Sequence, residues 1–471
     1  MSVLEQLLST LHGAVSVEGG RVTVVDEGLL QENVDGLVSR AVFGEGLERD
    51  LARWLIWESG QELGIYPASI HELYMAIGDG RVPPNFTVPA INVRGMNFNT
   101  SRAIFRAANK LNAGAILCEI ARSEIGYTSQ RPAEYIASVM GAAIKEGFRG
   151  PLCIQGDHFQ VSLKGYKANP TKEVQAVKDL MKEAVAAGFY NIDIDTSTLV
   201  DLSYDELDDQ QRVNYSLCAE LTAYARELEP EGITISLGGE IGEVGGHNST
   251  VEELHAFMQG YQRVLGEIHP ELKGISKISV QTGTSHGGVV LPDGTLAKVK
   301  VDFETLGELG RVARESYGLG GAVQHGASTL PPEAFGKFPQ VGTVEIHLAT
   351  GFQNIIYANA PQDVVEASYD YIRNNHAHEW KPKQTEEQFL YKTRKKAFGP
   401  LKAQWWGMDE AIMTQIGDAL QTQFEFLFEK LNIVNTREVA SNVITCVRQR
   451  RPMPMTAQQE ASLEIAGDLA D

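Results

Sequence analysis

The stretch LCIQGDHFQ, residues 152–160, is a short apolar run that ends in Asp157 and His158. Seven further runs share this short, apolar and β-branched character. In chain order, the eight runs cover residues 87–93, 115–120, 152–157, 190–195, 232–238, 275–283, 320–325 and 343–348. Continuous apolar runs of this length are typical of strands that a parallel sheet buries on both faces.

Helical patterns separate these runs and decide the fold class. Residues 99–112, 131–147, 171–188 and 203–229 repeat apolar positions at helical spacing, and Gly188 is placed like a helix stop. Strands that alternate with helices predict a parallel sheet. Eight repeats favour a closed (β/α)8 TIM barrel over an open doubly wound sheet. Since no GxGxxG motif follows the first strand, a dinucleotide-binding fold is disfavoured.

Additional helical segments are expected on both sides of this barrel. We expect a helical N-terminal extension over residues 1–66, the barrel over 67–380, a C-terminal helical region over 381–451 and a flexible tail over 452–471. The stretch from Ala403 to Leu431 is rich in aromatic residues. Its apolar density predicts docking on the barrel or on another subunit.

The composition restricts the classes of function that this chain can have. The 471 residues carry a formal net charge of −20, which argues against nucleic-acid binding because a phosphate backbone needs a basic face. The four cysteines are scattered, as in a reduced protein, and neither a signal peptide nor a bilayer-spanning stretch is apparent. We therefore expect a soluble, cytoplasmic protein that acts on a small molecule, without a nucleic-acid or membrane partner.

Three histidines lie at the ends of three different runs, each beside glycine or aspartate: His158, His286 in ISVQTGTSHGG and His325 in GAVQHGAST. Barrel strands present their C-terminal ends on the active face, and a catalytic zinc uses three protein ligands with one open position. Asp157, next to the first histidine, is a candidate acid/base for a substrate hydroxyl. The glycine-rich segments after the later histidines, which contain Gly287, Gly288, Gly326 and Ser328, can approach a phosphate closely.

In this order the segments resemble one known family. Seven segments between about residue 68 and about residue 400 are similar to the motifs of class II, zinc-dependent ketose-bisphosphate aldolases. They are PAINVRG, GDHFQ, AGFYNIDIDTS, GEIGEVGG, GTSHGG, VQHGAS and VEIHLATGFQ. The resemblance implies a TIM barrel, commonly dimeric, that cleaves a ketose phosphate without a Schiff base in carbohydrate metabolism. It implies Zn²⁺ on His158, His286 and His325 with Glu240 at the metal, a nearby monovalent cation, catalysis by Asp157 and Asn92, and a phosphate site at Gly287, Gly326, Ser328 and Thr350. Gly288 and His347 are further candidates for substrate or phosphate binding.

The sequence also departs from the family pattern. The family has glutamate after the double glycine of its catalytic loop, where this chain has His247 and Asn248. The alternatives for proton exchange on this loop are Glu243, which we favour, Glu252, Glu253 and His247. The family's Asn-x-Asp-Thr is replaced by residues 347–350, His-Leu-Ala-Thr. The usual arginine for the distal phosphate is missing, and we expect Arg94 and Arg122, with Lys164 and Lys167 nearby, to bind that anion instead.

Several functions stay open on the sequence alone. The first is zinc-dependent cleavage of fructose 1,6-bisphosphate, or of a different ketose phosphate, by a homodimer or higher oligomer. The second is a non-catalytic companion subunit of a tagatose-bisphosphate aldolase. A metal-dependent hydrolase ranks last because no histidine lies near the first strand end at Asn92. Cobalt or iron could replace zinc, and Glu240 could serve loop structure rather than the metal.

Overall fold

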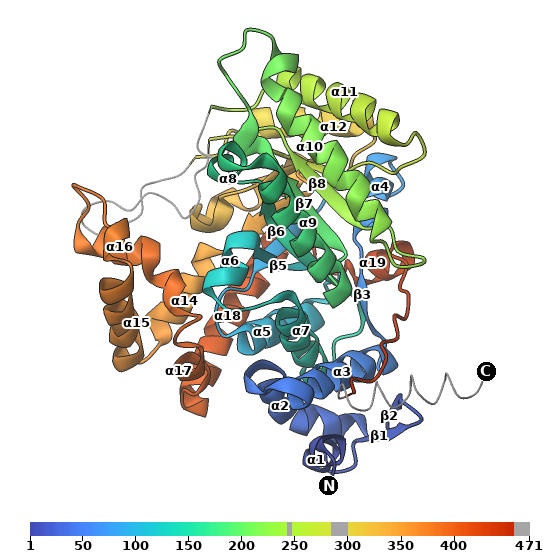
Figure 1. Cartoon of the computed structure of the whole chain (residues 1–471), viewed down its shortest axis with the longest axis vertical. Coiled ribbons are helices and arrows are strands. Elements are labelled where there is room, and N and C mark those ends of the chain that lie inside the picture. Colours follow the sequence, from blue (N-terminus) through green and yellow to red (C-terminus); the bar gives the residue numbers. More distant parts are fainter. Residues whose placement is uncertain (243–246, 284–299, 456–471) are drawn as a thin grey trace.

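A closed ring of eight parallel strands forms the centre of the computed structural model, which describes residues 1–242, 247–283 and 300–455 (Figure 1). The ring contains β4 (Val88–Asn92), β5 (Leu117–Ala121), β6 (Gly150–Gln160), β7 (Asn191–Asp195), β8 (Ser236–Glu240), β9 (Lys277–Val280), β10 (Ala322–Gln324) and β11 (Glu345–Leu348). Each strand pairs with the next along the chain, and β11 pairs with β4 to close the ring. The predicted (β/α)8 barrel is confirmed, and each of its strands overlaps one of the eight apolar runs.

Helices surround this ring. They are α5 (Asn97–Leu111), α6 (Arg122–Tyr127), α7 (Pro132–Lys145), α8 (Leu163–Ala168), α9 (Pro170–Ala187), α10 (Leu207–Glu227), α11 (Val251–Ile268), α12 (Phe303–Tyr317), α13 (Lys337–Gln340) and α14 (Thr350–Asn359). Gly188 ends α9 with φ 108°, where an L-residue is strained. Its missing Cβ also leaves room for Trp57 and Ile136, each of which would lie 2.7 Å from such an atom.

The N-terminal extension is mostly helical but also contains strands. It comprises α1 (Val3–Thr10), the hairpin β1 (Val15–Glu18) and β2 (Arg21–Val24), α2 (Glu27–Phe43) and α3 (Gly46–Glu62). β3 (Ile65–Ala68) crosses its boundary at residue 66, and α4 (His71–Gly78) follows before the first ring strand. β3 adds to the N-terminal end of β6 outside the ring. The Asn191 side chain accepts from Ile70 N and donates to Ala68 O and Ile154 O, so it joins β3 to the barrel.

The C-terminal region contains α15 (Gln362–Asn375), α16 (Glu386–Thr393), α17 (Lys402–Trp406), α18 (Glu410–Lys430) and α19 (Arg437–Val443). The aromatic stretch docks on the barrel through α18, which lies beside α5 and α14 (Figure 1). Phe424 is fully buried there, and Arg106 of α5 donates to Gln421 at 2.6 Å. Beyond α19, the backbone carbonyls of Gln449 and Arg451 accept hydrogen bonds from the Trp57 and Trp54 indoles of α3.

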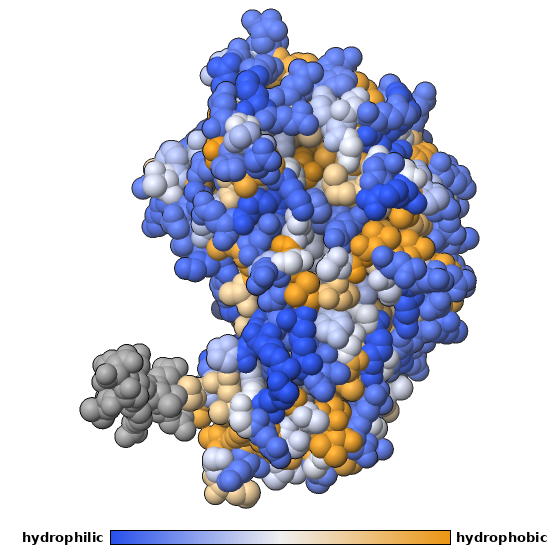
Figure 2. Space-filling model, turned by 90° about the vertical axis from the view of Figure 1, so that its right-hand side faces the viewer, coloured by the Kyte–Doolittle hydropathy of each residue, from blue (hydrophilic) through white to orange (hydrophobic). Residues whose placement is uncertain are grey.

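The surface matches the polar composition. The face shown in Figure 2 is mainly hydrophilic, with apolar side chains gathered in small groups. Among the described helices, none combines the length and the apolar character that a bilayer crossing requires.

Candidate active site and metal centre

An irregularity in β6 brings two neighbouring side chains to the mouth of the barrel. Successive residues of a regular strand point to opposite faces, so Asp157 and His158 could not both face the mouth. The register of β6 against β7 shifts between Gly156 and Phe159, and His158 has a φ of 41°. This bulge re-aims the second side chain. Backbone in the left-handed region costs roughly 1–2 kcal/mol for a non-glycine residue, a strain typical of functional sites.

His158 is oriented by a buried carboxylate of the next strand. Its Nδ1 lies 2.9 Å from Asp195 Oδ2 and 3.7 Å from Glu240 Oε2. Burial lowers the pKa of His158, but the charges of Asp157, Asp195 and Glu240 outweigh it and raise the pKa well above its ordinary value. A carboxylate behind one ring nitrogen is the usual support for a histidine whose other nitrogen binds a metal. The mouth therefore favours a cation, either a proton on the ring or a metal ion.

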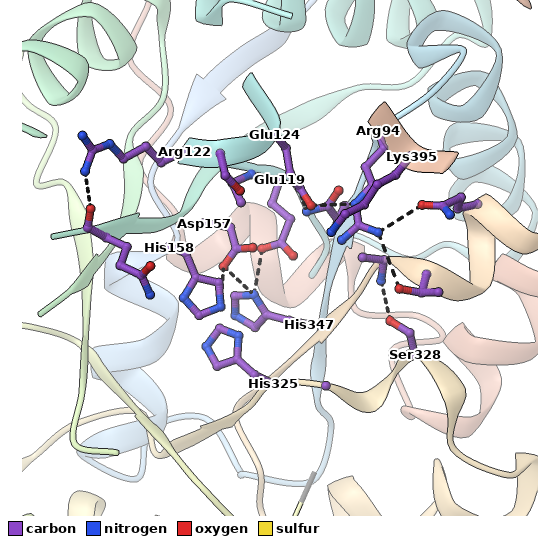
Figure 3. Close-up of a pocket in the computed structure, with 18 of the residues that line it drawn as sticks. Arg94, Glu119, Arg122, Glu124, Asp157, His158, His325, Ser328, His347 and Lys395 are labelled. Carbon is purple, nitrogen blue, oxygen red and sulfur yellow. Dashed lines mark hydrogen bonds and ion pairs between the residues drawn. The ribbon is translucent and has the colours of Figure 1, made fainter. Parts of the chain in front are cut away.

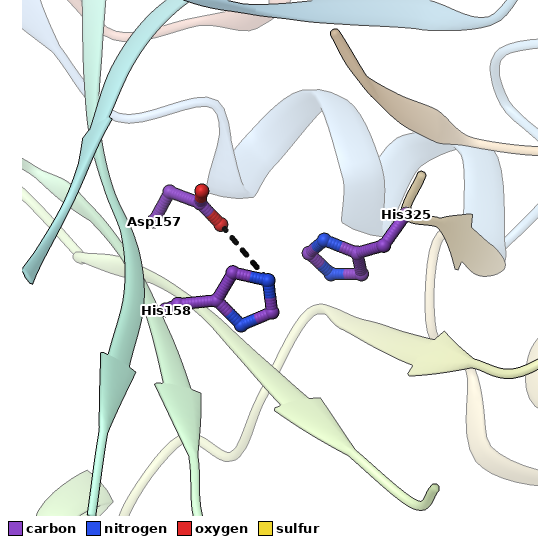
Figure 4. Close-up of side chains that lie close together, drawn as sticks. All are labelled: Asp157, His158 and His325. Carbon is purple, nitrogen blue, oxygen red and sulfur yellow. Dashed lines mark ion pairs between the residues drawn. The ribbon is translucent and has the colours of Figure 1, made fainter. Parts of the chain in front are cut away.

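His325 follows β10 and faces His158 across the mouth, with their ring centroids 4.4 Å apart (Figure 4). Its Nε2 lies 3.0 Å from the Ser279 hydroxyl. Asp157, His158 and His325, which we call the histidine cluster, each offer a ligand atom, and these atoms lie within 4.8 Å of one another. His158 Nε2 and Asp157 Oδ1 are 3.9 Å apart, close to the roughly 3.5 Å that separates two ligands of one tetrahedral zinc. The donor set fits a divalent metal ion.

A second element of the mouth is a basic end. Arg94 is nearly buried and pairs with Glu124 at 2.6 Å, while its Nη1 lies 3.2 Å from Gln353 Oε1. Lys395, from the C-terminal region, lines the same cavity. Burial and then the charge of Arg94 lower the pKa of Lys395 to about 8. Two cations with one carboxylate between them leave this end positive and able to hold an anion.

The backbone adds to this anion site. α14 begins at Thr350, and a helix N-terminus presents free N–H groups and a partial positive charge. Gly326 has φ 68°, and the Ser328 hydroxyl accepts from Ala349 N at 2.6 Å. These residues line one cavity of about 830 Å³ together with Arg94, Lys395 and the histidine cluster (Figure 3). The structure thus brings Gly326, Ser328 and Thr350 together, as the predicted phosphate site requires.

His347 lies deeper in the barrel, among carboxylates (Figure 3). Its Nδ1 is 3.0 Å from Glu119 and 3.2 Å from Asp157, and its Nε2 is 2.7 Å from Glu345 and 3.5 Å from Asp193. Burial opposes the charged form, but the neighbouring carboxylates, Glu119 foremost, raise the pKa of His347 well above its ordinary value. His347 therefore faces the barrel interior rather than the basic end.

A buried lysine forms the floor beneath His347. Lys277, at the start of β9, is fully buried and lies 2.8 Å from Asp193 Oδ1 and 2.5 Å from Glu345 Oε1. It also donates to Gln155 Oε1 at 2.7 Å. The Tyr74 hydroxyl donates to Glu345 from below. Barrel interiors are commonly filled by branched apolar residues, so an ionic floor is a particular feature of this chain.

The remaining predicted residues have mixed placements. Asn92 lines the cavity and donates from Nδ2 to Glu124 at 2.5 Å, while its buried Oδ1 has no hydrogen bond to the described residues. Arg122 lines the cavity too, but its guanidinium contacts Glu173 and the carbonyl of Gln160, away from Arg94. The residues predicted at Glu243, His286, Gly287 and Gly288 lie outside the described part of the chain.

Sequence reasoning missed several residues of this site. Asp193 and Asp195 alternate along one strand in the sequence, but this pattern is equally typical of residues that cap the next turn. Glu119 was visible only as the polar end of an apolar run. Lys395 carried no signal in the sequence. Its place in the mouth depends on how residues 394–397, far along the chain from the end of β11 at Leu348, fold back onto the barrel.

Comparison with known proteins places the chain in a family. The family model for class-II fructose-bisphosphate aldolase matches residues 83–404, which include all eight barrel strands and the cavity, and the chain belongs to this family. Its fold is similar to fructose-bisphosphate aldolase from Campylobacter jejuni, with 17% identity over 79% of this chain and 96% of that one and a TM-score of 0.47. The YdjI aldolase from Escherichia coli K12 is similar at 15% identity over 73% and 98%, with a TM-score of 0.41. No curated protein matches the chain.

Proposed function

We propose that this protein is a zinc-dependent aldolase that cleaves a phosphorylated ketose, with fructose 1,6-bisphosphate as the first candidate substrate and glyceraldehyde 3-phosphate and dihydroxyacetone phosphate as products. The observation that carries the proposal is the juxtaposition, in one cavity, of the histidine cluster with a basic end formed by Arg94 and Lys395. Family membership supports the same chemistry.

The metal ion belongs at the histidine cluster. The side chains that would hold it there are His158 and His325, with His286 as the further ligand predicted from the sequence and Glu240 nearby. When bound, a divalent ion polarises a substrate carbonyl and stabilises the negative charge left when the adjacent carbon–carbon bond breaks. Asp195 fixes the orientation of the His158 ring through the 2.9 Å contact at Nδ1.

Proton transfer and substrate binding are the work of this chain's side chains. Asp157 takes the proton from the hydroxyl on the carbon that becomes the aldehyde, since its carboxylate lies beside the histidine ligands. Asn92, which lines the cavity, hydrogen-bonds the substrate. Arg94, Lys395 and the N-terminus of α14 hold a phosphate. We propose Glu243 as the donor of the proton that the ketone fragment takes up.

A second candidate is a non-catalytic companion subunit. The loop after Gly246 favours it, because the two residues that replace the family's glutamates are already engaged. His247 Nε2 lies 2.8 Å from Glu253, and Asn248 donates to Asp302 at 3.2 Å. Glu253 in turn caps α11. Of the four alternatives for proton exchange on this loop, His247 and Glu253 are therefore engaged in other contacts, and Glu243 and Glu252 are left.

The test compares cleavage of several ketose phosphates by the purified chain, with triose phosphate release as the readout. Asp157→Asn keeps the size of the side chain and removes its basicity, so turnover should fall by about 10²–10⁴-fold. His378→Gln, on the exposed surface, is the matched control and should retain turnover. Full turnover by Asp157→Asn would contradict the assignment. No cleavage of any ketose phosphate by the metal-loaded wild type would favour the companion subunit.

A further inference from the structure

A second cavity, which we call the basal pocket, lies at the end of the barrel opposite the mouth. Its volume is about 540 Å³, within the range of pockets that hold small molecules. Its walls come from α4, from the segment that leads into β9 and from the end of α19. α4 and α19 lie on the side of the barrel away from α6 and α8 (Figure 1). The lining includes His71, Glu72, Met75, Arg81, Lys273 and Ile275.

The histidine of this pocket is buried and has unmet hydrogen-bonding capacity. His71 begins α4 and is 6% exposed, yet its Nδ1 has no hydrogen-bond partner among the described residues. Such buried polar atoms are rare and costly. Burial, and then the charges of Arg226 and Lys273, lower the pKa of His71 to about 3, so its ring is neutral at pH 7. A neutral imidazole keeps one N–H donor and one acceptor, and a bound ligand can use both.

Two cations of the basal pocket also have donors to spare. Lys273 Nζ donates to Thr234 Oγ1 at 2.9 Å and makes no other hydrogen bond to the described residues, so two of its N–H groups remain. Arg81 directs Nε and Nη2 at Asp79, at 2.8 and 2.7 Å, and its Nη1 has no hydrogen bond within the same part of the chain. Donors on cations form the strongest hydrogen bonds with anions.

The carboxylate that lines the pocket is engaged elsewhere. Glu72 Oε1 accepts from Thr445 Oγ1 at 3.0 Å, and its Oε2 accepts from the backbone N of the same residue. Both oxygens are therefore held by the segment after α19. Arg226, which pairs with Glu229, donates to the carbonyls of Lys273 and Gly274 at 2.8 Å and fixes this wall. The polar atoms left for a ligand are thus mainly donors, on two cations and one imidazole.

We propose that the basal pocket binds a phosphate group, with His71, Arg81 and Lys273 as its donors. A phosphate offers at least three terminal oxygens, so donors from separate segments can each contact one, whereas a carboxylate offers only two. Met75 and Ile275 line the remaining space, where they can contact the carbon skeleton of a phosphate ester. The mouth is the active face of such a barrel, so the basal pocket is an effector site separate from catalysis. The inference does not rest on the proposed function.

The test follows the His71 ring by nuclear magnetic resonance in the full chain labelled with ¹³C-histidine. The His71 signal is identified by its absence from His71→Gln. Inorganic phosphate, added at pH 7 and constant ionic strength, should shift this signal until the site is saturated. Lys273→Met and Arg81→Met should each weaken the affinity by about tenfold or more, because each removes charged donors. Both residues are exposed, so neither substitution disturbs the core.

Two control variants make the result specific. Lys182→Met removes an exposed lysine of α9 outside the pocket and should keep the wild-type affinity. Lys395→Met, at the mouth, should leave the His71 titration unchanged.

A His71 signal that phosphate does not move would overturn the proposal, and so would a titration that neither Lys273→Met nor Arg81→Met weakens. A titration that Lys395→Met weakens as strongly as they do would place the phosphate at the mouth and overturn it too. Tighter binding of glycerol 3-phosphate than of inorganic phosphate would identify the ligand as a phosphate ester, and equal binding would identify it as the free ion. The readout does not depend on turnover, so its failure leaves the proposed function untouched.

Discussion

Replacement of Asp195 by asparagine tests how the mouth prepares His158 for a metal ion. Asp195 is buried, and its Oδ2 contacts His158 Nδ1 at 2.9 Å and accepts from Gln160 Nε2 at 2.6 Å. In Asp195→Asn, the amide oxygen can keep both of these contacts, and the amide nitrogen can donate to the Ser197 hydroxyl. The 3.2 Å hydrogen bond from Ser197 N is lost, because the amide nitrogen cannot accept it. The substitution therefore keeps the support of His158 and removes its charge.

Asp195 lies behind His158, a proposed metal ligand, and this position determines the expected loss of metal affinity. Loss of such a contact costs about 10–100-fold in metal affinity, or about 1.4–2.7 kcal/mol. The assay is competition for Zn²⁺ between the metal-free protein and a chelating dye. Asp201→Asn, on an exposed loop after the same strand, is the matched control and should bind like the wild type. A Zn²⁺ affinity of folded Asp195→Asn within twofold of the wild type would show that the Asp195 charge does not support His158 as a metal ligand.

Three further predictions concern the basic end and the barrel wall. Lys395→Met should raise KM for a bisphosphorylated ketose about tenfold or more, with a smaller change in kcat, whereas an unchanged KM would separate Lys395 from the substrate. The pKa of Lys395 is lowered to about 8, so its positive charge is lost as pH rises through that value. Steady-state kinetics of the wild type should therefore show KM increasing above pH 8. Lys395→Met should lack this increase. Gly188→Ala places a Cβ 2.7 Å from Trp57 at φ 108° and should lower the urea-unfolding free energy by about 1–3 kcal/mol, while Gly266→Ala, in open space on α11, should not destabilise the protein.

The barrel was predictable because each of its strands has a recognisable local sequence pattern. Each ring strand is a short apolar run between helical patterns, so alternation and count were enough to give the closed ring. β3 escaped prediction, since four residues that include Pro67 resemble a loop in isolation. Its position depends on pairing with β6 and on the Asn191 side chain, both of which are long-range contacts.

The candidate site was predictable only in part. Strand ends bearing Asp157, His158 and His325 could be identified because parallel strands gather their C-terminal ends at one mouth. The bulge that turns both β6 side chains inward depends on register against β7, which a single strand does not encode. The carboxylates around His347 come from β5, β6, β7 and β11, so their meeting depends on the closure of the barrel. The position of Lys395 depends on the return of the C-terminal region. Each of these features is set by tertiary packing rather than by a local pattern.

In the proposed function, a metal ion at the histidine cluster drives aldol cleavage. Cleavage of fructose 1,6-bisphosphate by the purified protein should therefore be measured before chelation, after chelation and after Zn²⁺ is restored. We expect cleavage to be lost on chelation and to return with Zn²⁺. Cleavage that persists in protein verified to be free of metal would contradict the dependence on a metal ion.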